Sequence, residues 1–205
     1  IRDVIRVFLD AHRQYGNDEY LAAANRGGDF ILLAQMPDPQ PVWAQQYNMR
    51  MEPSWARKFE PASVTGGESV GAIRALLELY LYTGDAKYIA TIPPALEWFR
   101  MSAIGENRWA RFYELKTNRP LYFTKDYALV YTDDDMPTHY SFQSSYGVSG
   151  VTAYANRVMD EGREAVNEAA ARERTRDQKL ARAEGLAPAI REVIDALDSQ
   201  GRWVE

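Results

Sequence analysis

The sequence predicts an all-α fold, made of helical-hairpin repeats that form part of an (α/α) toroid, with long loops and a charged C-terminal helical extension. Two observations predict it. Apolar residues recur at helical spacing through most of the chain, and a unit of helix, glycine break and helix occurs twice. The two copies also end alike, in VWAQQY and RWARFY, so each carries a Trp-Ala-x-x-Tyr turn. Repeated helical hairpins typically bury their apolar faces against one another.

The first copy opens with a helix over residues 1–15, which Gly16 ends as a C-terminal cap. Asp18 caps the second helix, which stops at the proline-rich MPDPQPVW. In the second copy, a break at Gly84 separates AIRALLELYLYT from a helix that is interrupted near Pro93. Because the sequence opens on a helix already under way, we expect it to be a piece of a longer precursor.

The stretch from residue 114 to residue 146 breaks the helical pattern, with short extended pieces expected at 121–125 and 128–131. A loop this long in a helical domain is usually functional. From residue 147 the chain is helical again and densely charged, either as a solvated helix face or as an interaction arm. A last helix is expected over residues 186–197, with Pro188 in its first turn. We therefore predict one domain over residues 1–146 and a C-terminal extension over residues 147–205.

Composition excludes several classes of function. The 205 residues are 46% hydrophobic and 26% charged, as in an ordinary globular protein, and the formal charge of −5 argues against a general nucleic-acid binder. Without cysteine there is neither a disulfide nor a thiolate metal site, and two histidines are too few for a histidine-built zinc site. No apolar run is long enough to cross a bilayer. The segment TGGES lacks the strand and lysine of a phosphate-binding loop.

The loop PSWARKFEPASVTGGESVG is the strongest candidate for a binding site. It places the cations Arg57 and Lys58 between the aromatic residues Trp55 and Phe59, in a stretch with neither helix nor strand period. Aromatic faces beside fixed cations suit a ligand with flat apolar faces and negative charge. Acidic sugars fit that description.

The turns that follow the helices carry further cations, and in a toroid such turns gather at one rim. These cations are Arg57, Arg111, Arg119 and Lys125. In the alternative interpretation they form structural ion pairs. Arg57 would then pair with Glu60 or Glu68. Arg111 would pair with Glu114.

The acidic run Asp133-Asp134-Asp135 offers carboxylates close together in a loop, as calcium requires. Its spacing matches no EF-hand, and a solvated turn is the simpler interpretation. His139 is a candidate acid or base, although no partner for it is evident in the sequence.

Three segments occur in one order: WAQQYN, PSWARKFEPASVTGGESVG and RWARFYELKTNRPLYFTKD. Together they resemble the C-terminal part of the catalytic domain of family 10 polysaccharide lyases, the pectate (polygalacturonate) lyases with an (α/α)3 toroid. The similarity runs from residue 1 to about residue 131. It implies calcium-assisted β-elimination, in which an arginine removes the C5 proton of a uronate and the C4 oxygen leaves. Arginine is a difficult base, since its pKa exceeds about 12, so such a site favours alkaline conditions.

By this resemblance Arg57 matches the catalytic arginine and Arg111 matches a cation that binds substrate. Lys125 stands where the family commonly has the arginine of a Gly-Arg-Asp sequence, so the charge is kept and the two-pronged geometry is lost. The other predicted substrate-binding residues are Trp43, Trp55, Tyr113, Asn118, Arg119 and Asp126. The family's calcium ligands lie mostly upstream of residue 1.

The leading hypothesis is a secreted or periplasmic pectate lyase that uses calcium and acts on an acidic polysaccharide. A second hypothesis is a non-catalytic protein that binds acidic carbohydrate, or a scaffold, on the same helical fold. A third is an assembly component that associates through its charged C-terminal helix.

Overall fold

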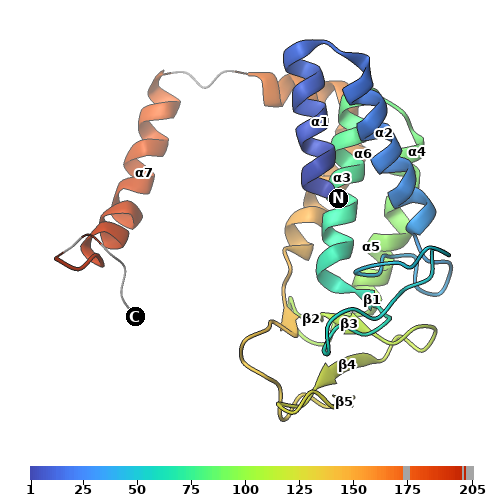
Figure 1. Cartoon of the computed structure of the whole chain (residues 1–205). Coiled ribbons are helices and arrows are strands. Elements are labelled where there is room, and N and C mark those ends of the chain that lie inside the picture. Colours follow the sequence, from blue (N-terminus) through green and yellow to red (C-terminus); the bar gives the residue numbers. More distant parts are fainter. Residues whose placement is uncertain (173–175, 200, 202–205) are drawn as a thin grey trace. The chain divides into compact units, whose positions relative to one another are not determined.

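The structure is a computed structural model in which residues 1–172, 176–199 and 201 are described (Figure 1). The chain divides into two compact units, Ile1–Val166 and Asn167–Glu205. The predicted domain boundary at residue 146 was drawn from the family resemblance and from the sequence pattern, and a division by compactness does not test it. That division therefore stays a prediction.

The first unit begins with five helices, and one short strand lies between the second helix and the third. They are α1 (Arg2–Tyr15), α2 (Asp18–Ala34), α3 (Gly66–Thr83), α4 (Lys87–Ala90) and α5 (Ile92–Met101). Figure 1 shows α1, α2 and α3 side by side. Buried residues occur on nearly every side of α3, from Ser69 to Leu79, because it is the central helix. Gly28 lets α2 approach it, since a β-carbon there would lie 2.4 Å from Leu79 Cδ1.

The helix ends largely follow the sequence signals. Gly16 and Gly84 cap α1 and α3 in the left-handed conformation, with φ of 67° and 77°. Asn17, rather than Asp18, caps α2, because its side chain accepts a hydrogen bond from the amide of Glu19. The interruption expected near Pro93 is the junction between α4 and α5.

Two small antiparallel sheets lie at one end of these helices (Figure 1). The first has the order β1 (Val64–Thr65), β3 (Phe112–Tyr113), β4 (Pro120–Phe123) and β5 (Leu129–Val130), and in the second β2 (Trp109–Ala110) pairs with β6 (Gln143–Ser144). The prediction of an all-α toroid fold is therefore wrong, and the chain is a mixed α/β protein. Most of these strands have two residues, too few to show an alternating pattern in the sequence. The extended pieces expected at 121–125 and 128–131 are found as β4 and β5.

The repeated Trp-Ala-x-x-Tyr turns have the same structural role in both copies. Trp43 Nε1 donates to the carbonyl of Ile31 (2.7 Å), near the end of α2. Trp109 Nε1 likewise donates to the carbonyl of Phe99 (2.8 Å), near the end of α5. Each tryptophan therefore closes the C-terminal end of the preceding helix, where carbonyls have no intrahelical partner.

The tyrosines of these turns act as a second link to the same helices. Tyr47 accepts a hydrogen bond from the alanine amide of its own motif and donates to the carbonyl of Ala34 (2.6 Å). Tyr113 does the same in the second copy and donates to the carbonyl of Ser102 (2.7 Å). Burial raises the pKa of Tyr47 to about 12, so its phenol stays a donor. The repeated Trp-Ala-x-x-Tyr sequence is thus explained by the hydrogen bonds that attach each turn to the helix before it.

Helix α6 (Val148–Ala171) follows the sheets, and its residues up to Val166 belong to the first unit. At Gly162 the backbone leaves the helical conformation, with φ of 81°. In the second unit, α7 (Arg176–Asp195) starts ten residues earlier than expected, so Pro188 lies inside the helix and not in its first turn. No described residue of α7 is buried.

Candidate active site

The loop that carries Arg57 is folded back on itself between α2 and α3. The amide of Glu60 donates to the carbonyl of Arg57 (2.9 Å), and the amide of Ala56 donates to the carbonyl of Glu60 (3.0 Å). This turn brings Arg57 Nη2 into an ion pair with Glu60 Oε1. The Glu60 side chain is 4% exposed and that of Arg57 is 61% exposed. The guanidinium therefore stands at the surface above a buried carboxylate.

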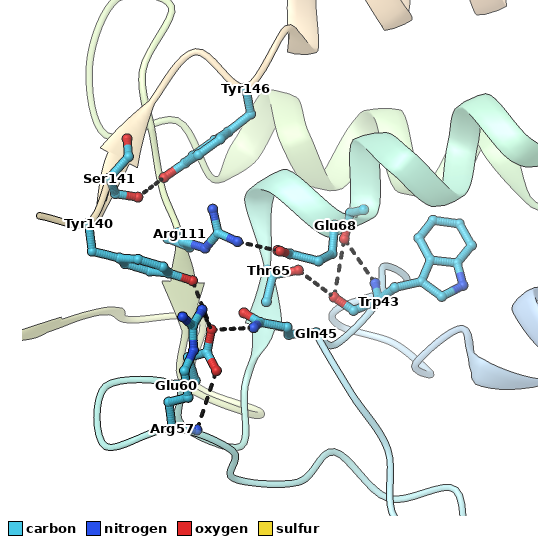
Figure 2. A network of polar contacts seen from close by, with 11 residues as sticks. Trp43, Gln45, Arg57, Glu60, Thr65, Glu68, Arg111, Tyr140, Ser141 and Tyr146 are labelled. Atoms are coloured by element: carbon cyan, nitrogen blue, oxygen red, sulfur yellow. Dashed lines mark hydrogen bonds and ion pairs between the residues drawn. The ribbon is translucent and has the colours of Figure 1, made fainter. Parts of the chain in front are cut away.

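Glu60 joins three segments of the chain through its carboxylate. Besides Arg57, it accepts hydrogen bonds from Gln45 Nε2 and from the hydroxyl of Tyr140 (3.1 Å), as Figure 2 shows. The Arg57 guanidinium, with these donors, lowers the pKa of Glu60 to about 2. In turn, the Glu60 carboxylate raises the pKa of Arg57 above its ordinary value. Both groups are thus charged through the neutral and alkaline range.

A second ion pair joins Arg111 Nη2 to Glu68 Oε1. Arg111 lies between β2 and β3, and Glu68 is in the first turn of α3. The two elements touch because residue 66 is a glycine: a β-carbon on Gly66 would lie 2.7 Å from the carbonyl oxygen of Ala110. Both arginines are therefore paired within the protein.

The structural ion pairs expected as the alternative are confirmed in one case and wrong in the other. Arg57 does pair with Glu60. Arg111 pairs with Glu68 rather than with Glu114, which instead accepts a hydrogen bond from the hydroxyl of Tyr131 (2.5 Å). Sequence proximity favoured Glu114, whereas the packing of α3 against β2 brings Glu68 closer.

Tyr140 lies between the two arginines (Figure 2). Its ring centroid is 5.4 Å from Cζ of Arg57 and 4.7 Å from Cζ of Arg111, within the range of cation–π attraction. Tyr146 stands nearby, with its hydroxyl donating to the carbonyl of Ser141 (3.0 Å). Sequence reasoning missed both tyrosines. The available signal was the density of aromatic residues in the long loop.

Several polar atoms in this cluster are buried without a hydrogen-bond partner in the described part of the chain. They are Gln45 Oε1, Glu68 Oε2 and Arg111 Nε. Buried polar groups are normally satisfied by protein or by ordered water. The cluster therefore has donor and acceptor capacity left for water or for a ligand that carries both kinds of group.

The turn with Lys125 and Asp126 adjoins the Arg57 loop. Phe59 stacks on Tyr127 with centroids 5.5 Å apart, and the half-exposed Trp55 meets Phe123 edge-on at 6.1 Å. Lys125 Nζ is 2.9 Å from Asp135 Oδ1, and both are exposed along with Asp126. Of the predicted site residues, the structure thus brings together Arg57, Arg111, Trp55 and the Lys125-Asp126 turn.

The remaining predicted binding residues make internal contacts. Trp43 and Tyr113 are buried in the repeated turns described above. Arg119 lies with its guanidinium carbon 3.5 Å from the ring centroid of Tyr131. Asn118 makes hydrogen bonds to three side chains inside the fold. Their roles in substrate binding stay predictions.

Asn118→Ala is expected to destabilise the protein by about 2 kcal/mol, because its amide group donates to Ser102 Oγ (2.7 Å) and accepts from Gln40 Nε2 and Trp98 Nε1. Asparagine also suits the positive φ of 58° at this position. Urea denaturation measures the loss, with the neighbouring exposed Thr117→Ala as control. Unchanged stability together with weaker binding of an acidic sugar would assign Asn118 to the ligand instead.

Two residues of the acidic run contact other side chains. Asp133 accepts a hydrogen bond from Gln143 Nε2 (2.7 Å), and Asp135 pairs with Lys125. Across the described residues, no group of three or more His, Asp or Glu side chains is placed to hold a metal ion. His139 meets the ring of Phe59 edge-on, at a centroid distance of 5.4 Å.

Known proteins are similar to this chain both in sequence and in fold. The family described as pectic acid lyase matches residues 8–108. Among solved structures, the family 10 polysaccharide lyase from Cellvibrio cellulosa is similar with a TM-score of 0.62 and 22% identity, covering 77% of this chain and 59% of that chain. A mutant of that lyase in complex with trigalaturonic acid is similar with a TM-score of 0.58 and 25% identity, covering 68% and 51%. No curated protein matches the sequence.

Residues 8–108 therefore match the pectic acid lyase family, and the resemblance of this chain to family 10 polysaccharide lyases is confirmed. The chain spans between 51% and 59% of the length of these solved relatives. Arg57 lies inside the matched segment, whereas Arg111 and Tyr140 lie beyond its end.

Proposed function

We propose that this chain is part of a lyase that cleaves pectate, the polymer of galacturonate, by β-elimination. One observation carries the proposal: Arg57 and Arg111 lie over one tyrosine ring in a chain whose residues 8–108 match the pectic acid lyase family. Guanidinium groups match carboxylates in shape and charge. The solved relative in complex with trigalaturonic acid supports an acidic sugar as the ligand.

In this proposal the two arginines bind the uronate ligand, and Arg111 stabilises the negative charge that builds on the carboxylate when Arg57, in its neutral form, takes the C5 proton. The Arg57 side chain is 61% exposed, so a ligand reaches it without unfolding the loop. Arg111 is paired with Glu68 and is 20% exposed. Arg57, which the resemblance matches to the catalytic arginine, is the group assigned to proton removal at C5. A double bond then forms between C4 and C5 as the C4–O bond breaks, and the leaving oxygen takes a proton from water.

The Glu60 contact sets a condition on this mechanism. A base must be neutral before it takes a proton, and the Glu60 carboxylate raises the pKa of Arg57. The contact between Arg57 Nη2 and Glu60 must therefore weaken when substrate binds. Alkaline conditions favour the same step.

We also propose calcium as the cofactor, as the family resemblance implies. The acidic residues that the structure describes do not fit a calcium site, since they form no suitable cluster. We assign none of them as a ligand.

A second candidate function is binding of acidic carbohydrate without turnover. The observation that favours it is the same ion pair, because a guanidinium kept protonated by Glu60 binds a carboxylate well but accepts no proton.

The ultraviolet absorbance of unsaturated uronate products separates the two functions. The protein is mixed with polygalacturonate at alkaline pH, with calcium or with a chelator. A rise that needs calcium supports the lyase and its cofactor, and a rise in both samples supports the lyase without calcium. If calorimetry shows that the sugar binds while absorbance stays flat, the non-catalytic function is supported.

Acting on a plant cell-wall polymer requires access to it, so we propose that the protein is secreted or periplasmic. Within the described residues, no helix is both long and apolar enough to span a membrane.

A further inference from the structure

The segment of residues 139–146 completes the arginine cluster although it lies beyond the stretch matched by the pectic acid lyase family. Tyr140 is the residue of this segment that touches both cations. Its contacts define a role that the family match does not assign.

The ring of Tyr140 limits how far apart the two guanidinium groups can lie. Their carbons are 5.4 and 4.7 Å from one centroid, so their separation is at most the sum of these distances. Two cations this close repel each other unless the charge is compensated. Glu60 and Glu68 supply one carboxylate to each arginine, and the ring presents its electron-rich face to both.

Tyr140 is itself firmly held. Its ring centroid is 4.7 Å from that of Phe59 and 5.1 Å from that of Phe142, and it stacks on Phe112 at 6.3 Å. The hydroxyl group donates to Glu60 Oε1. Burial raises the pKa of the phenol, so the ring carries no charge of its own at moderately alkaline pH. A ring fixed in this way holds the arginines in one arrangement.

We propose that Tyr140 is a positioning residue that couples Arg57 to Arg111, so that the two arginines bind a uronate ligand as one unit. This inference rests on the proposed function, because the ligand is the acidic sugar assigned there. It adds that the site depends on the aromatic ring from residues 139–146.

The test is the binding of trigalacturonic acid, measured by calorimetry, in a set of arginine and tyrosine variants. If the arginines act as a unit, Arg57→Lys and Arg111→Lys together weaken binding by clearly less than the product of their separate effects. Tyr140→Met removes the ring but fills its space among the aromatic neighbours. In that background we expect about tenfold weaker binding and independent effects of the two lysine substitutions.

Tyr140→Phe and Tyr82→Phe are the controls. Tyr140→Phe keeps the ring and should keep the coupling. Tyr82 also has an arginine over its ring, with Arg13 Cζ at 5.1 Å, and its hydroxyl is 2.6 Å from His12 Nδ1. It lies near the other end of α3 from Glu68, so Tyr82→Phe should leave binding unchanged.

A spectroscopic measurement keeps the inference testable even if Tyr140→Met does not fold. Trigalacturonic acid bound beside the ring should change the tyrosine absorbance of the wild-type protein. The change should vanish in Tyr140→Phe and persist in Tyr82→Phe. A change that persists in Tyr140→Phe contradicts the inference.

The outcomes also separate this inference from the proposed function. If the wild-type protein does not bind trigalacturonic acid, both are wrong. If it binds, and the lysine substitutions remain coupled in folded Tyr140→Met, the proposed function stands and the role of Tyr140 is wrong.

Discussion

Arg57→Lys should reduce β-elimination of polygalacturonate at least about 100-fold while changing the affinity for trigalacturonic acid only a few-fold. Lysine keeps the positive charge that attracts a carboxylate. It lacks the planar guanidinium of arginine, in which Nη2 contacts Glu60 while the other nitrogens remain available to a ligand. The expected result is therefore a loss of turnover with binding retained. Product absorbance measures the first and calorimetry measures the second.

Arg50→Lys is the matched control for this prediction. Arg50 lies on an exposed turn of the same loop region, where its Nη2 is 2.9 Å from Glu52 Oε2. Exposed pairs of this kind contribute little, so this variant should match the wild-type protein in both assays. Equal turnover in Arg57→Lys and Arg50→Lys would remove Arg57 from proton transfer.

The pH dependence of turnover gives a further check on the same assignment. Because Glu60 raises the pKa of Arg57, replacing Glu60 by Gln should lower it again. A neutral base then becomes available at lower pH. If Arg57 removes the proton, the alkaline rise in the rate should move to lower pH in the variant. A rise that stays at the wild-type pH would point to another base.

The helical part of the fold was predictable because its signals are local. Helical spacing and the glycines at positions 16 and 84 place α1, α2 and α3 well. The sheets were not predictable from pattern, since a strand such as Val64–Thr65 exists only through its partners. The repeated turn was found in the sequence, whereas its meaning, a tryptophan and a tyrosine that close helix ends, required the structure.

The candidate site shows the same division between local and distant contacts. The Arg57–Glu60 pair spans three residues and was foreseen as an alternative. The contacts of Glu68 with Arg111 and of Glu60 with Tyr140 join residues 43 and 80 positions apart. A single sequence has no pattern that encodes such distant pairs. For this reason the sequence favours Glu114 as the ion-pair partner of Arg111 and gives no indication of Tyr140.

Glu60→Gln is expected to destabilise the protein by about 2 kcal/mol at pH 7, after allowance for the exposure of Arg57. The wild-type Oε1 accepts from Arg57, Gln45 and Tyr140, and Oε2 faces the amide of Arg57 (3.3 Å). Glutamine supplies one oxygen and one NH2 group. In either orientation of the glutamine amide, its NH2 group faces another N–H or O–H donor. This mismatch is costly because residue 60 is only 3% exposed.

This destabilisation should shrink in acid, and the sign follows from the pKa of Glu60. The folded protein lowers that pKa from 4.5 to about 2, so the carboxylate contributes stability that is complete above pH 4.5 and is lost as the pH falls towards 2. The glutamine variant has no such group to protonate. Urea denaturation should therefore show that the difference in unfolding free energy between the wild-type protein and Glu60→Gln is less than half as large at pH 3 as at pH 7.

Glu52→Gln is the control, because Glu52 is also paired with an arginine of this region but is exposed. Its substitution should change stability less than that of Glu60 at pH 7. A constant difference between wild type and Glu60→Gln at the two pH values would mean that the carboxylate is not held in its charged form by the arginine. The ion pair would then not be what keeps Arg57 protonated, and the condition placed on the lyase mechanism would no longer apply.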